Sequence, residues 1–441
     1  MPSPQRYSPT DPMPSYLSGL TSLTSGEGAA VADPSHRVVR VEAKALPSGT
    51  APQHFAPTDP MPPYLAVATL RWKGIPQRFS PTAKAPRYLS TPTHQPMLWR
   101  LPLTVAAFLA IVVATFNLSP TTNNSLAIAA CYVAVIGGLS MLTGISGQIS
   151  LGNGAFMGFG SYATAIWITH HPSQPVWFAI ILAGIFGAAI GAIVGLPATK
   201  LRGPYLAGAT LAFGAAFSST VSYFTSWTGG DQGLALPQLV PPTWLVNHSN
   251  NLILGPQIVA NNRYWAWVAW GGALIILLLL SNLLTSRFGR QFRAVRDDDV
   301  AAELQGINVA RTRVTAFAIS SMCAAVGGGL LAVVQASVSP NTFNTTLSIG
   351  LLASMVIGGT GTMLGAVWGG LLWEFSNNWI ASLQNHFNIS PTGNVGSQLQ
   401  PLIFGGALIL VMLLAPGGIQ RQLSMVKAIV LRYARRGMLD R

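Results

Sequence analysis

Ionised residues are absent from the sequence between Leu101 and Thr199, where no Asp, Glu, Lys or Arg occurs. An ionised side chain at the centre of a membrane-spanning helix costs about 2.5–3.5 kcal/mol, so this absence is typical of a chain whose solvent is lipid. Charged residues make up 8% of all 441 residues, whereas a soluble domain has about 25%. The lack of charge excludes an ordinary soluble fold and predicts a polytopic membrane protein.

Other absences exclude functional classes. The two cysteines, Cys131 and Cys323, lie in apolar stretches, which predicts core residues and neither a disulfide nor a metal site. No Gly-x-x-x-x-Gly-Lys-Ser/Thr stretch occurs, so the chain has no P-loop for ATP. The net charge of +13 lies in tails and short loops without an aromatic–basic face, which argues against nucleic acid as a partner. We therefore expect no catalytic residues, cofactor or metal in this chain.

Ten apolar segments follow residue 96, most of them near the roughly 18–24 residues that a bilayer core of about 30 Å requires. They centre on 101–118, 125–143, 152–170, 176–197, 204–225, 264–285, 312–336, 347–359, 363–383 and 400–416. Glycine-rich breaks join the second to the third and the eighth to the ninth, which predicts broken or re-entrant helices. The sequence therefore predicts an all-α membrane protein with about ten transmembrane helices.

The basic residues predict the orientation of the chain. With the N-terminus in the cytoplasm, every Lys and Arg except Arg263 lies on the cytoplasmic side. Residues 1–95 are rich in Pro and Ser, contain three short repeats, and are predicted to form a disordered cytoplasmic tail that is attracted to membrane lipid. The transmembrane domain is predicted over 96–420, with a cytoplasmic loop at 286–313, and a basic cytoplasmic tail follows at 421–441.

Two glycine-rich segments coincide with the predicted breaks. They contain small and neutral polar residues: Gly147, Gln148, Ser150, Gly152 and Asn153 in the first, and Gly358, Gly359 and Gly361 in the second. Glycines at this density allow helices to approach closely. Two interpretations stay open, because such residues can line a path for a solute or serve packing alone. A third row, Gly187, Gly191 and Gly195, predicts only a packing face.

The loop 286–313 has the pattern of a helical hairpin. Arg290, Arg293 and Arg296 are spaced to lie on one side of a helix. Asp297, Asp298 and Asp299 favour the N-terminus of a second short helix that contains Glu303 and that Gly306 ends. The alternatives are a cytoplasmic docking element and an ordinary solvated loop, and the short apolar face flanked by charge favours docking.

In this order, the segments resemble the permease subunits of branched-chain amino-acid ABC importers, in particular the LivM type. The resemblance covers about 125–420 and rests on six stretches: Gly147–Gly152, Thr210–Phe213, Thr228–Leu234, Arg293–Asn308, Val356–Gly361 and Leu408–Leu413. Each stretch alone is weakly specific, whereas the ordered set is specific. Gly350 departs from the pattern, because family members often carry an acid there.

The resemblance implies an importer in the bacterial cytoplasmic (inner) membrane, with both termini cytoplasmic. Its partners are a second permease subunit, two cytoplasmic ATPase subunits that bind ATP and Mg, and an extracytoplasmic solute-binding protein. The residues implied in ATPase coupling are Arg290, Arg293, Arg296, Asp297, Asp298, Asp299, Glu303 and Gly306. The residues implied in the translocation pathway are Gly147, Gln148, Ser150, Gly152, Asn153, Gly358, Gly359, Gly361 and Glu374.

Three alternatives stay open at the level of sequence. A related importer for urea, short amides or other amino acids would share the same motifs. A secondary transporter driven by an ion gradient would need ionisable groups near the bilayer midplane, and only Glu374, an acid inside the ninth span, fits that need. A membrane scaffold recruited by the repeats of the tail would need no pathway at all.

Overall fold

The computed structural model describes residues 100–201, 203–237, 257–386 and parts of 402–423. The predicted tail 1–95, the middle of the long loop after the fifth span and most of the basic C-terminal tail lie outside the described residues. The tenth predicted span is described only in part. All statements below concern the described ranges.

The helices follow the sequence pattern, because each of the first nine predicted spans coincides with a helix. These helices are α2 (Arg100–Asn117), α3 (Pro120–Leu139) with its π-helical extension η4 (Ser140–Ile145), α4 (Asn153–His170), α5 (Val176–Ala198), α6 (Pro204–Tyr223), α9 (Gln257–Thr285), α12 (Val309–Gln335), α13 (Thr345–Gly358) and α14 (Met363–His386). Among the described residues, four helices are long and apolar enough to cross a membrane by length and composition. The number of ten crossings stays a prediction.

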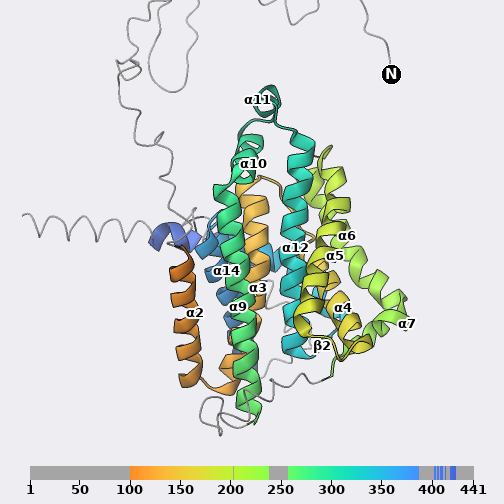
Figure 1. Cartoon of the computed structure of the whole chain (residues 1–441), viewed down its shortest axis with the longest axis vertical. Helices are drawn as coiled ribbons and strands as arrows, with labels where there is room; N and C mark the ends of the chain where they lie inside the picture. Colours follow the sequence, from red (N-terminus) through yellow and green to blue (C-terminus); the bar gives the residue numbers. More distant parts are fainter. Residues whose placement is uncertain are drawn as a thin grey trace, which may run out of the picture. The chain divides into compact units, whose positions relative to one another are not determined.

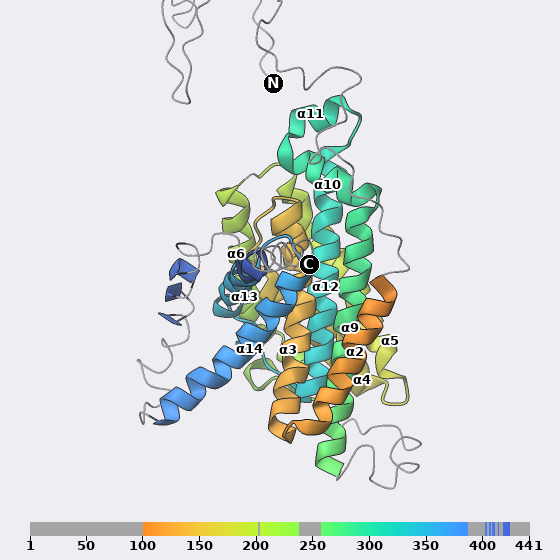
Figure 2. The same cartoon turned by 90° about the vertical axis from the view of Figure 1, so that its left-hand side faces the viewer.

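Two helices form the centre of the bundle (Figures 1 and 2). In their most apolar windows, 83% of the α3–η4 residues and 72% of the α12 residues are buried, against 39% for α5 and 44% for α9. The outer helices expose large apolar side chains, among them Val113, Ile185, Ile193 and Leu279. Exposed apolar side chains outside and a close-packed centre fit a bundle that lipid surrounds.

Small residues bring the helices together. A Cβ added at Gly187 would collide with Ala325, and one added at Gly191 would collide with Ser321, so α5 lies directly on α12. The predicted packing role of this glycine row is therefore confirmed. The contact between α4 and α12 is as close, because a Cβ at Gly160 would collide with the carbonyl oxygen of Ala325. Interhelical contact of this kind replaces the hydrophobic driving force that lipid removes.

The all-α prediction needs one small correction. Two short strands, β1 (Leu234–Ala235) and β2 (Ser337–Val338), pair in an antiparallel ladder in which Leu234 lies opposite Val338. Before β1, the short elements α7 (Thr225–Thr228) and η5 (Gly230–Gln232) follow α6, and glycines with positive φ turn the chain sharply. The turn η6 (Pro340–Phe343) follows β2. The ladder joins the segment after α6 to the segment after α12.

The closeness of α4 and α12 yields a test. Gly160→Val should destabilise the purified protein by about 1–3 kcal/mol or more, because the added side chain meets backbone that cannot rotate away. Gly208→Val on α6 is the matched control, since no described atom lies within 4 Å of the position of its Cβ. Thermal unfolding in detergent measures both variants. Equal melting temperatures would contradict the close α4–α12 contact.

Candidate functional site

The first predicted break separates α3 from α4. The π-helical turn η4 widens the end of α3, and the chain then runs without regular helix from Ser146 until α4 begins at Asn153. Gly147 has φ +73°, a conformation that side-chain-bearing residues seldom adopt. The sequence of small and neutral polar residues therefore ends one helix and starts another, as predicted.

The second break separates α13 from α14 and lies against the first. Gly359 and Gly361 have positive φ between the two helices. The Gly361 N–H donates to Ser140 Oγ at 3.0 Å. A Cβ at Gly144 would collide with the backbone of Gly361. The backbones of the two breaks are therefore in direct contact, with no side chain between them.

The helical hairpin is formed by α10 (Arg287–Asp297) and α11 (Asp299–Leu304), which project from one end of the bundle (Figure 1). Ser286 and Asp298 cap the two helices, because Ser286 Oγ accepts from the N–H of residue 288 and Asp298 Oδ1 accepts from those of 300 and 301. Gly306, with φ +81°, follows the end of α11. A small apolar cluster holds the hairpin to the start of α12: Val295, Ala302 and Val309.

Arginines of α10 bind carbonyl oxygens of the transmembrane part. Arg296 donates to the Gly144 carbonyl oxygen in the first break, and its Cγ packs against Gly147. Arg293 donates to the Leu284 carbonyl oxygen at 2.8 Å, at the end of α9. Arg290, Asp297, Asp298 and Glu303 are exposed. The hairpin is thus attached to the first break through a charged side chain.

A buried ion pair holds α11 to α12. Arg313 on α12 pairs with Asp299 on α11, and the two side chains are 10% and 17% exposed. Arg313 also donates to the Thr199 carbonyl oxygen at 3.4 Å, which brings in the end of α5. A pair so shielded from water keeps most of its attraction but has a large desolvation cost, so both partners need each other.

Gln148 connects the first break to α12. Its Nε2 donates to Ser146 Oγ at 2.6 Å and to the Arg313 carbonyl oxygen at 3.5 Å, and the residue is 5% exposed. In this orientation the amide nitrogen faces the Arg313 carbonyl oxygen, which can only accept a hydrogen bond.

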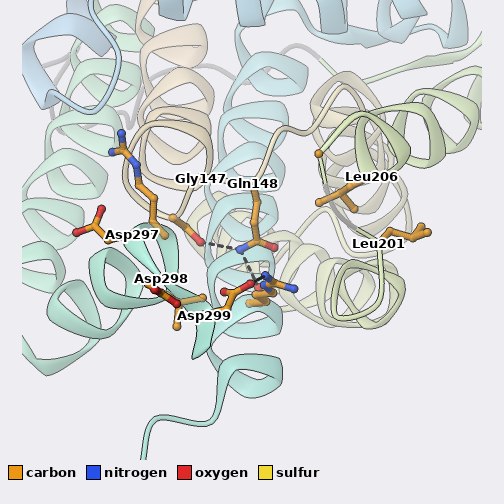
Figure 3. Close-up of a pocket in the computed structure, with 12 residues that line it drawn as sticks. Gly147, Gln148, Leu201, Leu206, Asp297, Asp298 and Asp299 are labelled. Atoms are coloured by element: carbon orange, nitrogen blue, oxygen red, sulfur yellow. Dashed lines mark hydrogen bonds and ion pairs between the residues drawn. The ribbon is translucent and has the colours of Figure 1, made fainter. Parts of the chain in front are cut away.

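These elements enclose a pocket of about 280 Å³, called here the hairpin pocket (Figure 3). Its lining residues come from the first break, the hairpin, α12 and the α5–α6 connection: Ser146, Gly147, Gln148, Leu201, Gly203, Leu206, Val295, Arg296, Asp297, Asp298, Asp299 and Arg313. The pocket therefore brings together residues that the sequence places in two separate motifs.

Other predicted pathway residues lie deeper or elsewhere. Ser150 and Asn153 are buried, and the N–H of Gly154 donates to Ser348 Oγ of α13 at 3.0 Å. Gly358 packs on the backbone of α14 at Gly365. Glu374 is not part of this group, because Asn378, which donates to it at 3.4 Å, also donates to Ser125 near the other end of α3 at 2.9 Å.

Several residues that build the site were not predicted from the sequence. Arg313 was included only as the end of a loop, although a cation at the start of an apolar span is a signal for a buried ion pair. Thr210 Oγ1 accepts from the Leu151 N–H at 2.9 Å. Nothing in the sequence predicted this contact, although Thr210 lies in one of the stretches that resemble the family. Across the described ranges, no three His, Cys, Asp or Glu side chains are placed to hold a metal ion.

Comparison with known proteins gives consistent matches. A family model described as "Branched-chain amino acid transport system / permease component" matches residues 121–415. The chain is 28% identical to the high-affinity branched-chain amino acid transport system permease protein LivM of Escherichia coli K12, over 72% of this chain and 74% of that protein. It is 26% identical to LivH of the same strain, over 67% and 93%. No solved structure matches.

A further relative is named for a different solute. The chain is 32% identical to the autoinducer 2 import system permease protein LsrC of Enterobacter sp. (strain 638), over 50% of this chain and 60% of that protein. The same sequence pattern is therefore shared by permeases named for unlike solutes.

The buried ion pair predicts how firmly the hairpin is held. Arg313→Met should release α11, since removal of one partner from a buried pair costs about 3–5 kcal/mol. Amide hydrogen exchange over 299–304 should then speed up by about a hundredfold or more. Arg311→Met is the control, because Arg311 is exposed on the same turn of α12. Unchanged exchange in Arg313→Met would show that the pair does not hold the hairpin.

Proposed function

Because this chain belongs to the family of branched-chain amino acid transport system permease components, we propose that it forms half of the membrane channel of an ABC importer. A second permease chain forms the other half, two cytoplasmic ATPase subunits bind ATP and Mg, and an extracytoplasmic binding protein delivers the solute. The chain's similarity to both LivM and LivH supports a paired permease. The chain itself catalyses no reaction.

The attachment of the hairpin to the two breaks is the observation that carries this proposal. Arg296 of α10 holds the Gly144 carbonyl oxygen, and Gly144 in turn lies on Gly361 of the second break. A displacement of the hairpin by the ATPase subunits would therefore reach both breaks through direct contacts. This arrangement suits a channel whose cytoplasmic end opens and closes in step with ATP binding.

The exposed face of α11 is the proposed docking surface for the ATPase. Val300 and Leu304 are 66% and 85% exposed and lie one turn apart, with Glu303 beside them. The two large apolar side chains form a small apolar patch, and Glu303 lies at its charged rim. An apolar centre with a polar rim is the usual composition of a protein–protein interface. Arg293 and Arg296 are exposed as well as bonded within the chain, so we propose a positioning role for them beside their predicted contact with the ATPase.

Branched-chain amino acids are the proposed solutes. The residues of the two breaks that we assign to the pathway are Gly147, Gln148, Ser150, Gly152, Asn153, Gly358, Gly359 and Gly361, which are small or neutral. A neutral path suits a zwitterion that needs passage without tight binding. An importer for urea, short amides or other amino acids is the alternative, and the similarity to an autoinducer 2 permease supports keeping it. Glu374 lies apart from the breaks, which disfavours a secondary transporter.

The proposed topology has ten transmembrane spans, with both termini and the hairpin in the cytoplasm of the bacterial inner membrane. Residues 1–95 form a cytoplasmic tail outside the channel, 96–420 form the transmembrane domain and 421–441 form a basic tail. We expect residues 1–95 to contact lipid and a cytoplasmic partner. The channel should form without these contacts.

Reconstitution tests the proposed function. The purified chain alone should transport no solute into liposomes under an ion gradient, because it has no energy source of its own. The assembly with the second permease, ATPase and binding protein should import radiolabelled leucine when ATP is present on the ATPase side. Transport by the single chain driven by an ion gradient would overturn the proposal and favour a secondary transporter.

The docking surface has its own test. Leu304→Ala should weaken the binding of the ATPase subunits to the permease by about tenfold or more, because truncation of a central apolar anchor costs about 2 kcal/mol or more. Leu279→Ala on α9 is the control, since Leu279 is 57% exposed on a transmembrane helix. Binding of the ATPase to immobilised permease measures both. Equal losses for the two variants would count against docking at α11.

A further inference from the structure

An apolar cleft lies between α4, α5 and α6, and its volume is about 810 Å³. This outer cleft, as it is called here, is lined by residues of 159–167, 182–189 and 217–224, and by Trp227 and Thr228 of α7. In each of the three long helices the lining residues recur at i, i+3, i+4 and i+7, the spacing of a single helix face. Figure 1 shows α6 and α7 at the edge of the bundle, beside α4 and α5. Three helix faces therefore converge on the cleft.

Three phenylalanine rings connect the helices at one end of the cleft. The ring of Phe159 on α4 lies 4.7 Å from that of Phe217 on α6 and 6.3 Å from that of Phe186 on α5, centroid to centroid. At the other end the cleft reaches Phe224 and Trp227, which are 53% and 68% exposed. The three helices are thus in contact through aromatic rings at one end, whereas the other end is open to the surroundings.

The cleft presents almost no polar group to an occupant. The hydroxyl groups of Thr220 and Thr228 donate to backbone carbonyl oxygens at 2.7–2.8 Å. Tyr162 Oη and Trp167 Nε1 are buried, so neither atom faces the open space. Water does not fill apolar spaces of this kind, and an empty space would leave the rings without contacts. The cleft therefore suits an apolar occupant.

The depth of the cleft matches one leaflet of a bilayer. The lining of α4 spans eight residue steps, or roughly 12 Å, against about 15 Å for half of the hydrocarbon core. Trp167 lies near the end of α4, and Ala189 lies just past the middle of α5. The cleft thus extends from one membrane surface to about the midplane. In the proposed topology these ends of α4 and α6 are extracytoplasmic, which makes the leaflet the outer one.

The cleft is continuous with the surface that lipid covers. Ile181, Ile185 and Ile193 on α5 are each at least 60% exposed, and Ile185 also lines the cleft. Helix–helix contacts in membranes are rich in small residues, and α5 uses its glycine row for such a contact with α12. Large apolar side chains line most of the cleft instead. This lining favours a flexible acyl chain over a helix of a partner protein.

We propose that the outer cleft binds one acyl chain of a phospholipid from the outer leaflet. The methyl end of the chain lies against Phe159, Phe186 and Phe217, and its ester end lies between Trp167 and Trp227. The headgroup then lies at the membrane surface, where tryptophan side chains are common. Only the choice of leaflet rests on the proposed topology, because the lining and the depth of the cleft hold for either orientation.

The bound chain would stabilise the position of α6. The cytoplasmic half of this helix is held to the first break, since Thr210 Oγ1 accepts from the Leu151 N–H. The other half would pack on the lipid between it and α5. A ligand that binds the folded state alone raises its stability, so added phospholipid should raise the melting temperature of protein from which lipid has been removed.

Lipid retention by the purified chain tests the site. The unmodified protein should keep a phospholipid through extensive washing in detergent, as measured by native mass spectrometry. Ala189→Trp places a large ring in the cleft from an exposed position of α5 and should keep about tenfold less. Ile193→Trp, one turn further along the exposed side of α5, is the matched control and should keep as much as the unmodified protein.

Thermal unfolding separates loss of the site from loss of the fold. Added phospholipid should raise the melting temperature of the delipidated unmodified protein and of Ile193→Trp, and it should leave that of a cooperatively unfolding Ala189→Trp unchanged. Equal lipid retention and equal stabilisation in the two variants, or no retained lipid in the unmodified protein, would overturn the site.

A phosphatidylethanolamine that carries a photoreactive diazirine on its acyl chain tests the orientation. After washing and illumination, a diazirine at the methyl end should label Phe159, Phe186 or Phe217, and one near the ester should label Trp167 or Trp227, as mapped by peptide mass spectrometry. The reverse order would overturn the assignment to the outer leaflet. The same labelling should persist in the assembly with the second permease and the ATPase subunits, whereas its loss there would show that protein covers the cleft and would overturn the proposal.

Discussion

The contact between the backbones at Gly144 and Gly361 is the constraint on which the cytoplasmic end of the bundle depends. A Cβ at position 144 would collide with the backbone of Gly361, so η4 and the segment before α14 can meet only because position 144 is glycine. Position 361 favours glycine for another reason, its φ of +74°. Ser140 Oγ then accepts the Gly361 N–H. Since the second break is not a regular helix, the Gly361 N–H needs a partner outside its own helix, and a bilayer offers no water in place of Ser140.

The hairpin is built onto this contact. Arg296 reaches the Gly144 carbonyl oxygen from α10, and the Arg313–Asp299 pair fixes α11 to α12. The two links lie on either side of the turn at Asp298, one at the end of α10 and one at the start of α11, and they hold the hairpin to η4 and to α12. The charged side chains of Arg296, Asp299 and Arg313 thus bind within the chain, while the apolar side chains of Val300 and Leu304 are exposed.

Much of the fold could be predicted from the sequence, because lipid forces long apolar runs into helices and basic residues mark the connections between them. The breaks at Gly147 and Gly359 and the hairpin ending before Gly306 followed from local signals. Contacts between distant segments carried no such signal. The spacing of Arg293 and Arg296 placed them on one helix side, but whether that side faces a partner or the chain's own carbonyl groups depends on the tertiary fold.

Gly350 shows how packing explains a departure from the family pattern. A Cβ at this position of α13 would collide with the ring of Trp373 on α14, whose ring also meets that of Tyr132 edge to face at 6.1 Å. An acid cannot occupy position 350 while this tryptophan lies there, so the two positions are coupled. The neighbouring Glu374 places its carboxylate with Asn378, which also binds Ser125, on the α3–α14 contact. In this chain an acid thus lies beside the tryptophan on α14, and the facing position on α13 is small because the indole ring fills the space.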